Sequence, residues 1–308
     1  MILRALKASG GDSLLLLGDG AKVLIDGGPA GVYNNVLRDE LDSLDNEPDG
    51  SPTRFDLVMV SHIDADHIVG VLELAEEMIE ADDEEADPIV RVAAAWHNTF
   101  SDMIAGEQGA PQTDSAALSA AGLFEQITGT SKPSDISKLV LSSVKQGRQL
   151  RLDLDRLNIP LNPGFDDDLV LLDNQRVPLE IGELTLTVVG PTKTELDDLK
   201  EKWKKELPDI LAKERAASTE AVGCLDRSVS NLASIVVGAQ VGDRKALLTG
   251  DARGDLMLPW LEASGHVAPG PDGTGEFHIV KLPHHGAAGN VSEEFFRRVR
   301  ADHYVVSG

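Results

Sequence analysis

Four side chains that can bind a metal lie within six residues of the chain. They are His62, Asp64, Asp66 and His67, in the run Ser-His-Ile-Asp-Ala-Asp-His that begins at Ser61. Imidazole nitrogens and carboxylate oxygens bind zinc, manganese and iron, and they can hold an ion while leaving a position for water. The alternative is an acidic surface loop with two incidental histidines, but four such residues in this order favour a metal site.

The segments on either side of this run indicate which elements hold the four side chains. Residues 56–60 are mainly apolar and end at Ser61, which predicts a short buried strand. Residues 68–80 place apolar side chains near helical spacing and acids on the other face, which predicts an amphipathic helix. The candidate ligands therefore lie on a strand-to-helix turn, where open α/β sheets usually bind their ligands.

Acids and histidines also follow other predicted strands. These side chains are Asp26, His97, Asp251 and the pair His284 and His285. Because separate strand ends would deliver them to one rim, we expect a site for two metal ions, with Asp251 as a candidate bridge between them. Two of them have a second interpretation, since Asp26 could be a turn residue or could orient a metal-bound histidine, and His97 could be structural or a ligand.

The remaining pattern predicts alternating strands and helices in a single domain that spans residues 1–308. Helices are expected at 34–44 and, from an apolar stripe, between Leu196 and Leu207. Further strands are expected at 14–17, 22–25, 89–96, 184–189, 232–237, 245–249, 277–282 and 304–306. Residues 99–183 carry helical patterns and loops without a catalytic signal, and we interpret them as an insertion or lid over the site.

The composition excludes several classes of protein. The single cysteine, Cys224, excludes a disulfide framework and a thiolate zinc site. The net charge of −24 makes long duplex nucleic acid a poor partner, unless metal and a local basic patch compensate. No run of about 18 apolar residues predicts a membrane span. The first seven residues are too short and too charged for a signal peptide, so a cytoplasmic location is the default expectation.

Taken together, these residues resemble the metallo-β-lactamase superfamily of hydrolases. Within it, they resemble most the hydrolase domain of ComEC/Rec2-type DNA-uptake proteins and their stand-alone relatives. The matching segments follow the order of the family and are residues 11–13, 24–28, 61–67, 231–237, 247–252 and 282–286. The resemblance implies an α/β fold, a four-layer αββα sandwich with the metal site at its edge.

The resemblance also implies how the ligands divide between two divalent ions. The first ion would be held by His62 and Asp64, with His97 as a candidate third ligand. The second would be held by Asp66 and His67. Asp251 would bridge the two ions, and one of His284 and His285 would complete the second position.

Two departures from the common family pattern bear on these expectations. The commoner motif has histidine in place of Asp64, whereas the DNA-uptake branch shares the aspartate. An oxygen-rich first position shifts the preference from Zn²⁺ towards Mn²⁺. Ala287 stands where that branch often has serine. The branch also has membrane spans and an oligonucleotide-binding domain, which this sequence lacks, so a role in DNA transport is not expected.

The expected activity is metal-dependent hydrolysis of a phosphodiester in a nucleic acid or nucleotide. The ions would lower the pKa of a bound water, and the resulting hydroxide would attack phosphorus. Asp66 would orient the water and accept its proton. His97 or His285 would stabilise the leaving oxygen, and arginines 297, 298 and 300 would contact phosphate. The alternatives are hydrolysis of a thioester, lactone or β-lactam carbonyl, and a non-catalytic binding protein of the same fold. No protein partner is indicated.

Overall fold

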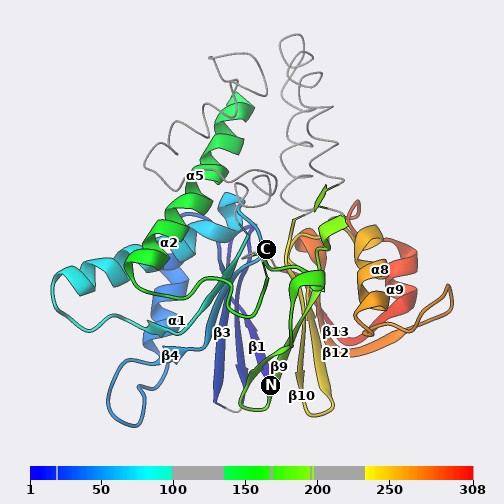
Figure 1. The fold of residues 1–308 in the computed structure, drawn as a ribbon, viewed down its shortest axis with the longest axis horizontal. Coiled ribbons are helices and arrows are strands. Elements are labelled where there is room, and N and C mark those ends of the chain that lie inside the picture. The colour runs from blue at the N-terminus through cyan, green and yellow to red at the C-terminus, as the bar shows by residue number, and fades with distance from the viewer. Residues whose placement is uncertain (19, 99–134, 167–168, 195, 198–232, 308) are drawn as a thin grey trace.

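The computed structural model describes residues 1–18, 20–98, 135–166, 169–194, 196–197 and 233–307. These residues form two large β-sheets and one small sheet, and helices lie on the outside of both large sheets (Figure 1). The α/β class predicted from the sequence is confirmed. Among the helices described, none combines the length and the apolar character needed to cross a membrane.

The first large sheet has five strands in the order β1, β2, β3, β5 and β7. They span Ile2–Ala5, Ser13–Gly18, Ala21–Gly27, Leu57–Val60 and Ala95–His97. The first three are antiparallel neighbours, whereas β3, β5 and β7 are parallel. The carboxyl ends of these three parallel strands therefore lie at one edge of the sheet, as the sequence predicted for Asp26 and His62.

The second large sheet has six strands in the order β13, β12, β11, β10, β9 and β8. They span Val299–Val305, Gly275–Lys281, Arg244–Leu248, Val236–Val241, Leu184–Gly190 and Leu179–Ile181. Because β11, β12 and β13 are parallel, their carboxyl ends also share one edge. The predicted hairpin of β10 and β11 is confirmed, although β10 begins four residues later than expected, at Val236.

Three groups of buried side chains hold these layers together. One lies between the two large sheets, because the inward faces of β2, β3 and β5 meet those of β9, β10 and β11. A second lies between the first sheet and α1 (Arg38–Asp42), α2 (Ala65–Asp83) and α5 (Asp135–Arg156). A third lies between the second sheet and α8 (Gly254–Ala263) and α9 (Glu293–Arg298). Figure 1 shows the first set of helices on the left and the second on the right. This packing is consistent with the predicted αββα sandwich.

Two predicted elements differ from the structure. The strand expected at 89–96 is broken into β6 (Arg91–Val92) and β7, and β6 pairs with β4 (Arg54–Phe55) in the small sheet. The helix expected at 68–80 is longer at both ends, because α2 begins at Ala65 and continues to Asp83. The helix predicted at 34–44 is confirmed as a π-helical turn, η1 (Tyr33–Leu37), followed by α1.

The predicted insertion at 99–183 is described only in part. Helix α5 packs against α2, and its Leu150 and Leu154 belong to the core beside the first sheet. Strand β8 belongs to the second sheet, so the end of this region is part of the framework. Residues 99–134, and the predicted helix between Leu196 and Leu207 beyond residue 197, lie outside the described residues. The role of a lid stays a prediction.

Two glycines allow the start of α2 to approach β3 closely. A Cβ atom added at Gly70 would lie 2.0 Å from the carbonyl oxygen of Gly27, and one at Gly27 would lie 2.3 Å from the backbone nitrogen of Val71. The Gly70 N–H group donates to the carbonyl of Gly28 at 3.0 Å. This backbone contact fixes the first turn of α2, with Asp66 and His67, against the end of β3.

Replacing Gly70 with alanine is expected to destabilise the protein. Helix propensity alone would favour alanine by roughly 1 kcal/mol, but the new methyl group would collide with backbone that cannot rotate away. We therefore expect a net loss of about 1–3 kcal/mol in the free energy of unfolding. Denaturant melts would measure it against Gly289→Ala, where a Cβ atom meets nothing within 4 Å. A rise in stability for Gly70→Ala would contradict the close approach.

Candidate metal centre

The strand-to-helix turn predicted from the sequence is present. Strand β5 ends at Val60 and α2 begins at Ala65, so His62 and Asp64 lie on the connection between them. The second sheet reaches this turn directly, because the Ile235 N–H group donates to the carbonyl oxygen of Ser61 at 2.9 Å. The edges of the two large sheets that carry the predicted site residues therefore meet here.

A glycine after β11 brings Asp251 to the same place. Gly250 has a left-handed backbone, with φ of 50°, a conformation that glycine adopts without steric cost. A Cβ atom there would lie 2.9 Å from Cβ of Ser61 and 3.0 Å from Oγ of Ser234. The backbone N–H of Asp251 donates to Ser234 Oγ at 3.1 Å, which anchors Asp251 independently of its carboxylate.

The rings of His62 and His67, on the turn and helix that follow β5, are each held through Nδ1 by an oxygen. Nδ1 of His67 lies 2.8 Å from Oδ2 of Asp26, and Nδ1 of His62 lies 3.1 Å from Oγ of Ser61. Asp26 also accepts hydrogen bonds from the backbone N–H and hydroxyl of Ser61, at 2.7 and 2.6 Å. An oxygen partner on Nδ1 orients the ring and leaves Nε2 for a metal. The interpretation of Asp26 as an orienting carboxylate is therefore supported.

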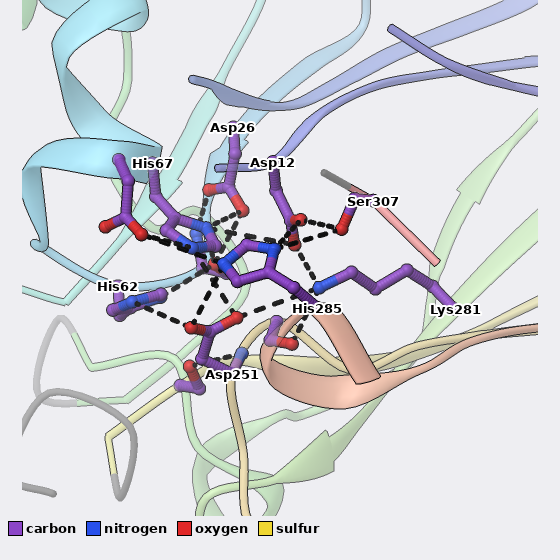
Figure 2. Close-up of polar contacts among 12 residues, drawn as sticks. Asp12, Asp26, His62, His67, Asp251, Lys281, His285 and Ser307 are labelled. Atoms are coloured by element: carbon purple, nitrogen blue, oxygen red, sulfur yellow. Dashed lines mark hydrogen bonds and ion pairs between the residues drawn. The ribbon is translucent and has the colours of Figure 1, made fainter. Parts of the chain in front are cut away.

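The ring of His285, which follows β12 of the second sheet, also has oxygen atoms beside its Nδ1 atom. Nδ1 of His285 lies 3.3 Å from Oγ of Ser307 and 3.4 Å from Oδ1 of Asp12. His285 lies in a short 3-10 turn after β12, η3 (Pro283–Gly286), and its φ of 53° turns the ring towards the first sheet. Figure 2 shows the rings of His62, His67 and His285 converging on Asp251.

Asp251 faces all three rings. Its Oδ1 atom lies 3.5 Å from Nε2 of His67, and its Oδ2 atom lies 3.7 Å from Nε2 of His285 and 4.0 Å from Nε2 of His62. Two atoms that bind one ion at about 2.1 Å lie roughly 3–3.5 Å apart, as the bond lengths require. The separations in the cluster are close to those of ligands around a cation.

Two further carboxylates, those of Asp64 and Asp66, lie beside the rings. Oδ2 of Asp64 lies 3.6 Å from Nε2 of His62. Oδ2 of Asp66 lies 3.7 Å from Nε2 of His285 and 4.0 Å from Nε2 of His67. Among the described residues, the ligand atoms of His62, Asp66 and His67 lie within 4.8 Å of one another, and so do those of Asp12, His67 and His285. His67 belongs to both groups, and Asp251 faces both.

The ligand atoms of this cluster are buried without ordinary hydrogen bonds. Among the described residues, Nε2 of His62, His67 and His285 and Oδ1 of Asp251 have no hydrogen-bond partner. Buried polar atoms are nearly always paired, because leaving them unpaired costs free energy. A divalent cation would satisfy nitrogen and oxygen atoms together, so the residues present fit a divalent metal.

The charges of the cluster are strongly coupled. Burial alone would lower the pKa of His67, but the carboxylates of Asp26 and Asp251 raise it well above its ordinary value. The carboxylates of Asp12 and Asp66, which face its two ring nitrogens, raise the pKa of His285 to about 9. Burial would raise the pKa of Asp251, yet the nearby charge of His67 holds it well below its usual range. A divalent cation would take the place of the protons on these two rings.

Exposure identifies the side from which a substrate can approach. The side chains of His62, His67 and Asp251 are at most 4% exposed, whereas those of Asp66 and His285 are 40% and 19% exposed. The solvent-facing side of the cluster is therefore formed by Asp66 and His285. Because Asp66 lies in the first turn of α2, after β5 of the first sheet, and His285 lies in η3, after β12 of the second sheet, this side lies where the two sheets meet.

Two predicted ligands are not among the side chains that converge. His97 is buried at the end of β7, and its Nε2 atom lies 3.3 Å from the carbonyl oxygen of Gly147 in α5. The backbone N–H of His284 donates a hydrogen bond to the carbonyl oxygen of Gly250. The ring of His284 contacts that of His285 edge-on, with the ring centroids 5.9 Å apart. Neither belongs to the groups of closely spaced ligand atoms among the described residues, so their role as ligands stays a prediction.

Sequence reasoning missed three residues that hold the cluster: Asp12, Lys281 and Ser307. Lys281 is fully buried, and its ammonium forms an ion pair with the carboxylate of Asp12. Ser307 donates a hydrogen bond to the same carboxylate. One signal was available, since a lysine within the otherwise apolar end of a predicted buried strand requires a buried acid.

The predicted phosphate contact of three arginines is wrong. Helix α9 precedes β13, so Arg297 and Arg300 lie where β13 begins, and Val299 pairs with Gly275 at the start of β12. The candidate metal centre lies at the opposite end of these strands, beyond Lys281. Arg297 pairs with Asp272 and Glu294, Arg298 with Glu262, and Arg300 with Glu276.

Comparison with known families supports a metal-dependent hydrolase. Residues 6–116 match the family model of the metallo-beta-lactamase superfamily. Domains of this superfamily are generally metal-dependent and hydrolytic. The matched segment, about a third of the chain, contains Asp12, Asp26 and the turn from Ser61 to His67. No curated protein matches the chain. The resemblance to the DNA-uptake branch stays a prediction.

Proposed function

We propose that the protein is a phosphodiesterase that uses two divalent ions, Mn²⁺ or Zn²⁺. One ion would be held by His62, Asp64 and Asp251, and the other by Asp66, His67, Asp251 and His285. We also propose that the fold is the αββα sandwich of the metallo-beta-lactamase superfamily, for which the family match and the three core groups give support.

One observation carries the proposal. Three buried Nε2 atoms, each with its Nδ1 atom held by an oxygen, converge on the carboxylate of Asp251 from two different sheets. A network built only for stability would pair these nitrogen atoms with hydrogen-bond partners. A cluster that leaves them unpaired is instead suited to bind cations.

The residues on the open side would act on the substrate. When bound, the two ions would lower the pKa of a coordinated water and neutralise charge on the phosphate oxygens. Asp66, the most exposed of the carboxylates, would orient the attacking water and accept its proton. Because Nε2 of His285 faces Asp66 and Asp251, we assign this ring to the second ion in preference to the predicted contact with the leaving oxygen.

The charge of the protein favours a small or single-stranded phosphodiester. The net charge is −24, and the three arginines once expected to contact phosphate are paired with acids away from the site. Long duplex nucleic acid would be repelled by such a surface. A nucleotide or short single strand needs contact only with the ions and the few residues around them. The preference for Mn²⁺ follows from the oxygen ligand Asp64.

The assay compares phosphodiester and carbonyl substrates on the full chain after loading with Mn²⁺ or Zn²⁺. We expect hydrolysis of bis-p-nitrophenyl phosphate and of short single-stranded DNA or RNA, abolished by a chelator. Asp66→Asn should lower the rate constant by about 10²–10⁴-fold, which is the usual contribution of a general base. Asp302→Asn, which changes an exposed acid on β13, serves as the matched control.

Three outcomes would overturn the proposal. Hydrolysis of thioesters, lactones or β-lactams with phosphodiesters left intact would assign the site to carbonyl chemistry. Metal binding without hydrolysis of any substrate in the panel would favour a binding protein. An Asp66→Asn variant as active as the Asp302→Asn control would remove Asp66 from the mechanism.

A further inference from the structure

Lys281 is a fully buried lysine beside the candidate metal centre. It is the last residue of β12, and its side chain has no exposure to solvent. Its Nζ atom donates to the carbonyl oxygen of Gly250 at 2.9 Å, forms an ion pair with Asp12, and lies 3.7 Å from Oδ1 of Asp251. Lysine is almost never fully buried unless it is paired, so these partners account for its position.

The contacts of Lys281 lead to one part of the centre. Asp12 is itself buried, and its other oxygen lies 3.4 Å from Nδ1 of His285. Asp251 faces His67 and His285 through its two oxygens. Lys281 thus reaches His285 through Asp12 and contacts Asp251 directly, as Figure 2 shows. In the described part of the chain, its ammonium contacts Gly250, Asp12 and Asp251, and neither His62 nor Asp64.

The charges around the centre show why a fixed cation is useful there. Five carboxylates gather around the three rings: Asp12, Asp26, Asp64, Asp66 and Asp251. Two divalent ions and the Lys281 ammonium together carry five positive charges, which would match them. Before metal binds, Lys281 is the one lysine or arginine among the described residues that pairs with any of these carboxylates. Without it, Asp12 and Asp251 would repel each other at low dielectric.

We propose that Lys281 is a positioning residue that holds Asp12 and Asp251 so that the second metal position is assembled before the ion arrives. That position consists of Asp66, His67, Asp251 and His285. The inference rests on the metal-binding part of the proposed function and adds that the two positions differ. The first, at His62 and Asp64, shares only Asp251 with the contacts of Lys281, whereas the second is also reached through Asp12 and His285.

Two other roles for Lys281 predict different results. If Lys281 only reduced the negative charge of the centre, its removal would strengthen the binding of both ions, because the attraction between the ions and the carboxylates would rise. If it were only a structural ion pair, its removal would lower the melting temperature of the metal-free protein and leave both affinities unchanged. A positioning role instead predicts that the binding of one ion weakens much more than the binding of the other.

The experiment titrates Co²⁺ or Zn²⁺ into the metal-free full chain in competition with a chelator. The Co²⁺ absorption spectrum reports the coordination of each ion as it binds. In Lys281→Met, we expect the affinity for one ion to fall about 10–100-fold, as for other residues that orient metal ligands. The affinity for the other ion, which shares only Asp251 with these contacts, should fall less. Lys281→Arg, which keeps the charge, should restore part of the lost affinity.

A second substitution tests the route through Asp12. Asp12→Asn should weaken the same ion, and the double variant with Lys281→Met should be no weaker than the more affected single variant, because both act through one contact. Lys22→Met, which breaks the part-exposed ion pair with Glu47 far from the centre, is the matched control. If Lys281→Met does not fold, the spectra and affinities of Asp12→Asn and Lys281→Arg decide the question.

The outcomes separate this inference from the proposed function. The role of Lys281 would be overturned if the variants lost affinity for both ions equally, gained affinity for both, or showed no change. The metal centre itself would stand in each of these cases. A wild-type protein that binds no divalent ion would overturn both. Because the readout is metal binding, a failure to hydrolyse phosphodiesters does not affect it.

Discussion

Asp251→Asn is expected to lose at least one metal ion and nearly all hydrolytic activity. Among the described residues, the carboxylate of Asp251 is the one group that faces His62, His67 and His285 at 3.5–4.0 Å, so both ions would depend on it. Asparagine keeps the shape but removes the charge and one acceptor oxygen. We expect the metal content to fall from two ions per chain to one or none. Turnover should fall by about 10³-fold or more, which is roughly 4 kcal/mol of transition-state stabilisation.

The measurement is elemental analysis combined with turnover of bis-p-nitrophenyl phosphate. The backbone of Asp251 is anchored on Ser234 through its N–H group, so the substitution should leave the fold intact, and circular dichroism checks this. Asp255→Asn is the matched control, because Asp255 lies at the start of α8 and pairs only with Arg253 in the described structure. A variant that keeps two ions and activity within about threefold of the control would show that Asp251 bridges nothing.

The affinity for metal is expected to rise steeply with pH. In the metal-free protein the pKa of His285 is raised to about 9, and that of His67 is raised well above its ordinary value. Both rings therefore carry protons at neutral pH, and each must lose one before its Nε2 atom can bind an ion. Each displaced proton makes the apparent affinity rise about tenfold per pH unit while the pH is below the pKa of its ring, so two displaced protons together give about 100-fold per unit.

Chelator competition at pH 6, 7 and 8 measures this slope, and calorimetry in two buffers counts the protons released. His303→Gln, which replaces an exposed histidine on β13, should leave the slope unchanged. An affinity for metal that is constant from pH 6 to 8 would contradict the displacement of protons from these two rings.

The stability of the metal-free protein is expected to change with pH in the opposite direction to the affinity for metal. The stabilisation from His285 is complete below its unfolded pKa, about 6.5, and is lost as pH rises through about 9.

Local spacing was enough to predict much of the fold and part of the centre. The strand-turn-helix that carries His62 to His67 could be recognised because hydrophobic periodicity changes from strand to helix at Ser61. The convergence of Asp251 on this turn could be predicted in outline, since both follow the carboxyl ends of strands. Which ring of the pair after β12 enters the centre could not be predicted. Both His284 and His285 adopt left-handed backbone, and only the packed structure fixes where each ring points.

The contacts that hold the ligands depend on distant parts of the chain. Asp12 and Ser307 are 295 positions apart, and a sequence pattern cannot pair them. The prediction that arginines 297, 298 and 300 contact phosphate was wrong for a similar reason. Their distance from the centre follows from the parallel pairing of β12 and β13, which places the end of α9 at the far edge of the sheet. The need for glycine at positions 27 and 70 likewise could not be predicted, because it arises only from the close backbone contact between β3 and α2.

Anomalous X-ray diffraction from crystals grown with Mn²⁺ or Zn²⁺ would locate the ions themselves. We expect two peaks roughly 3.5–4 Å apart, one beside His62 and Asp64 and one beside His67 and His285, with Asp251 between them. Crystals without anomalous density at these side chains, or with ions bound only elsewhere on the acidic surface, would contradict it.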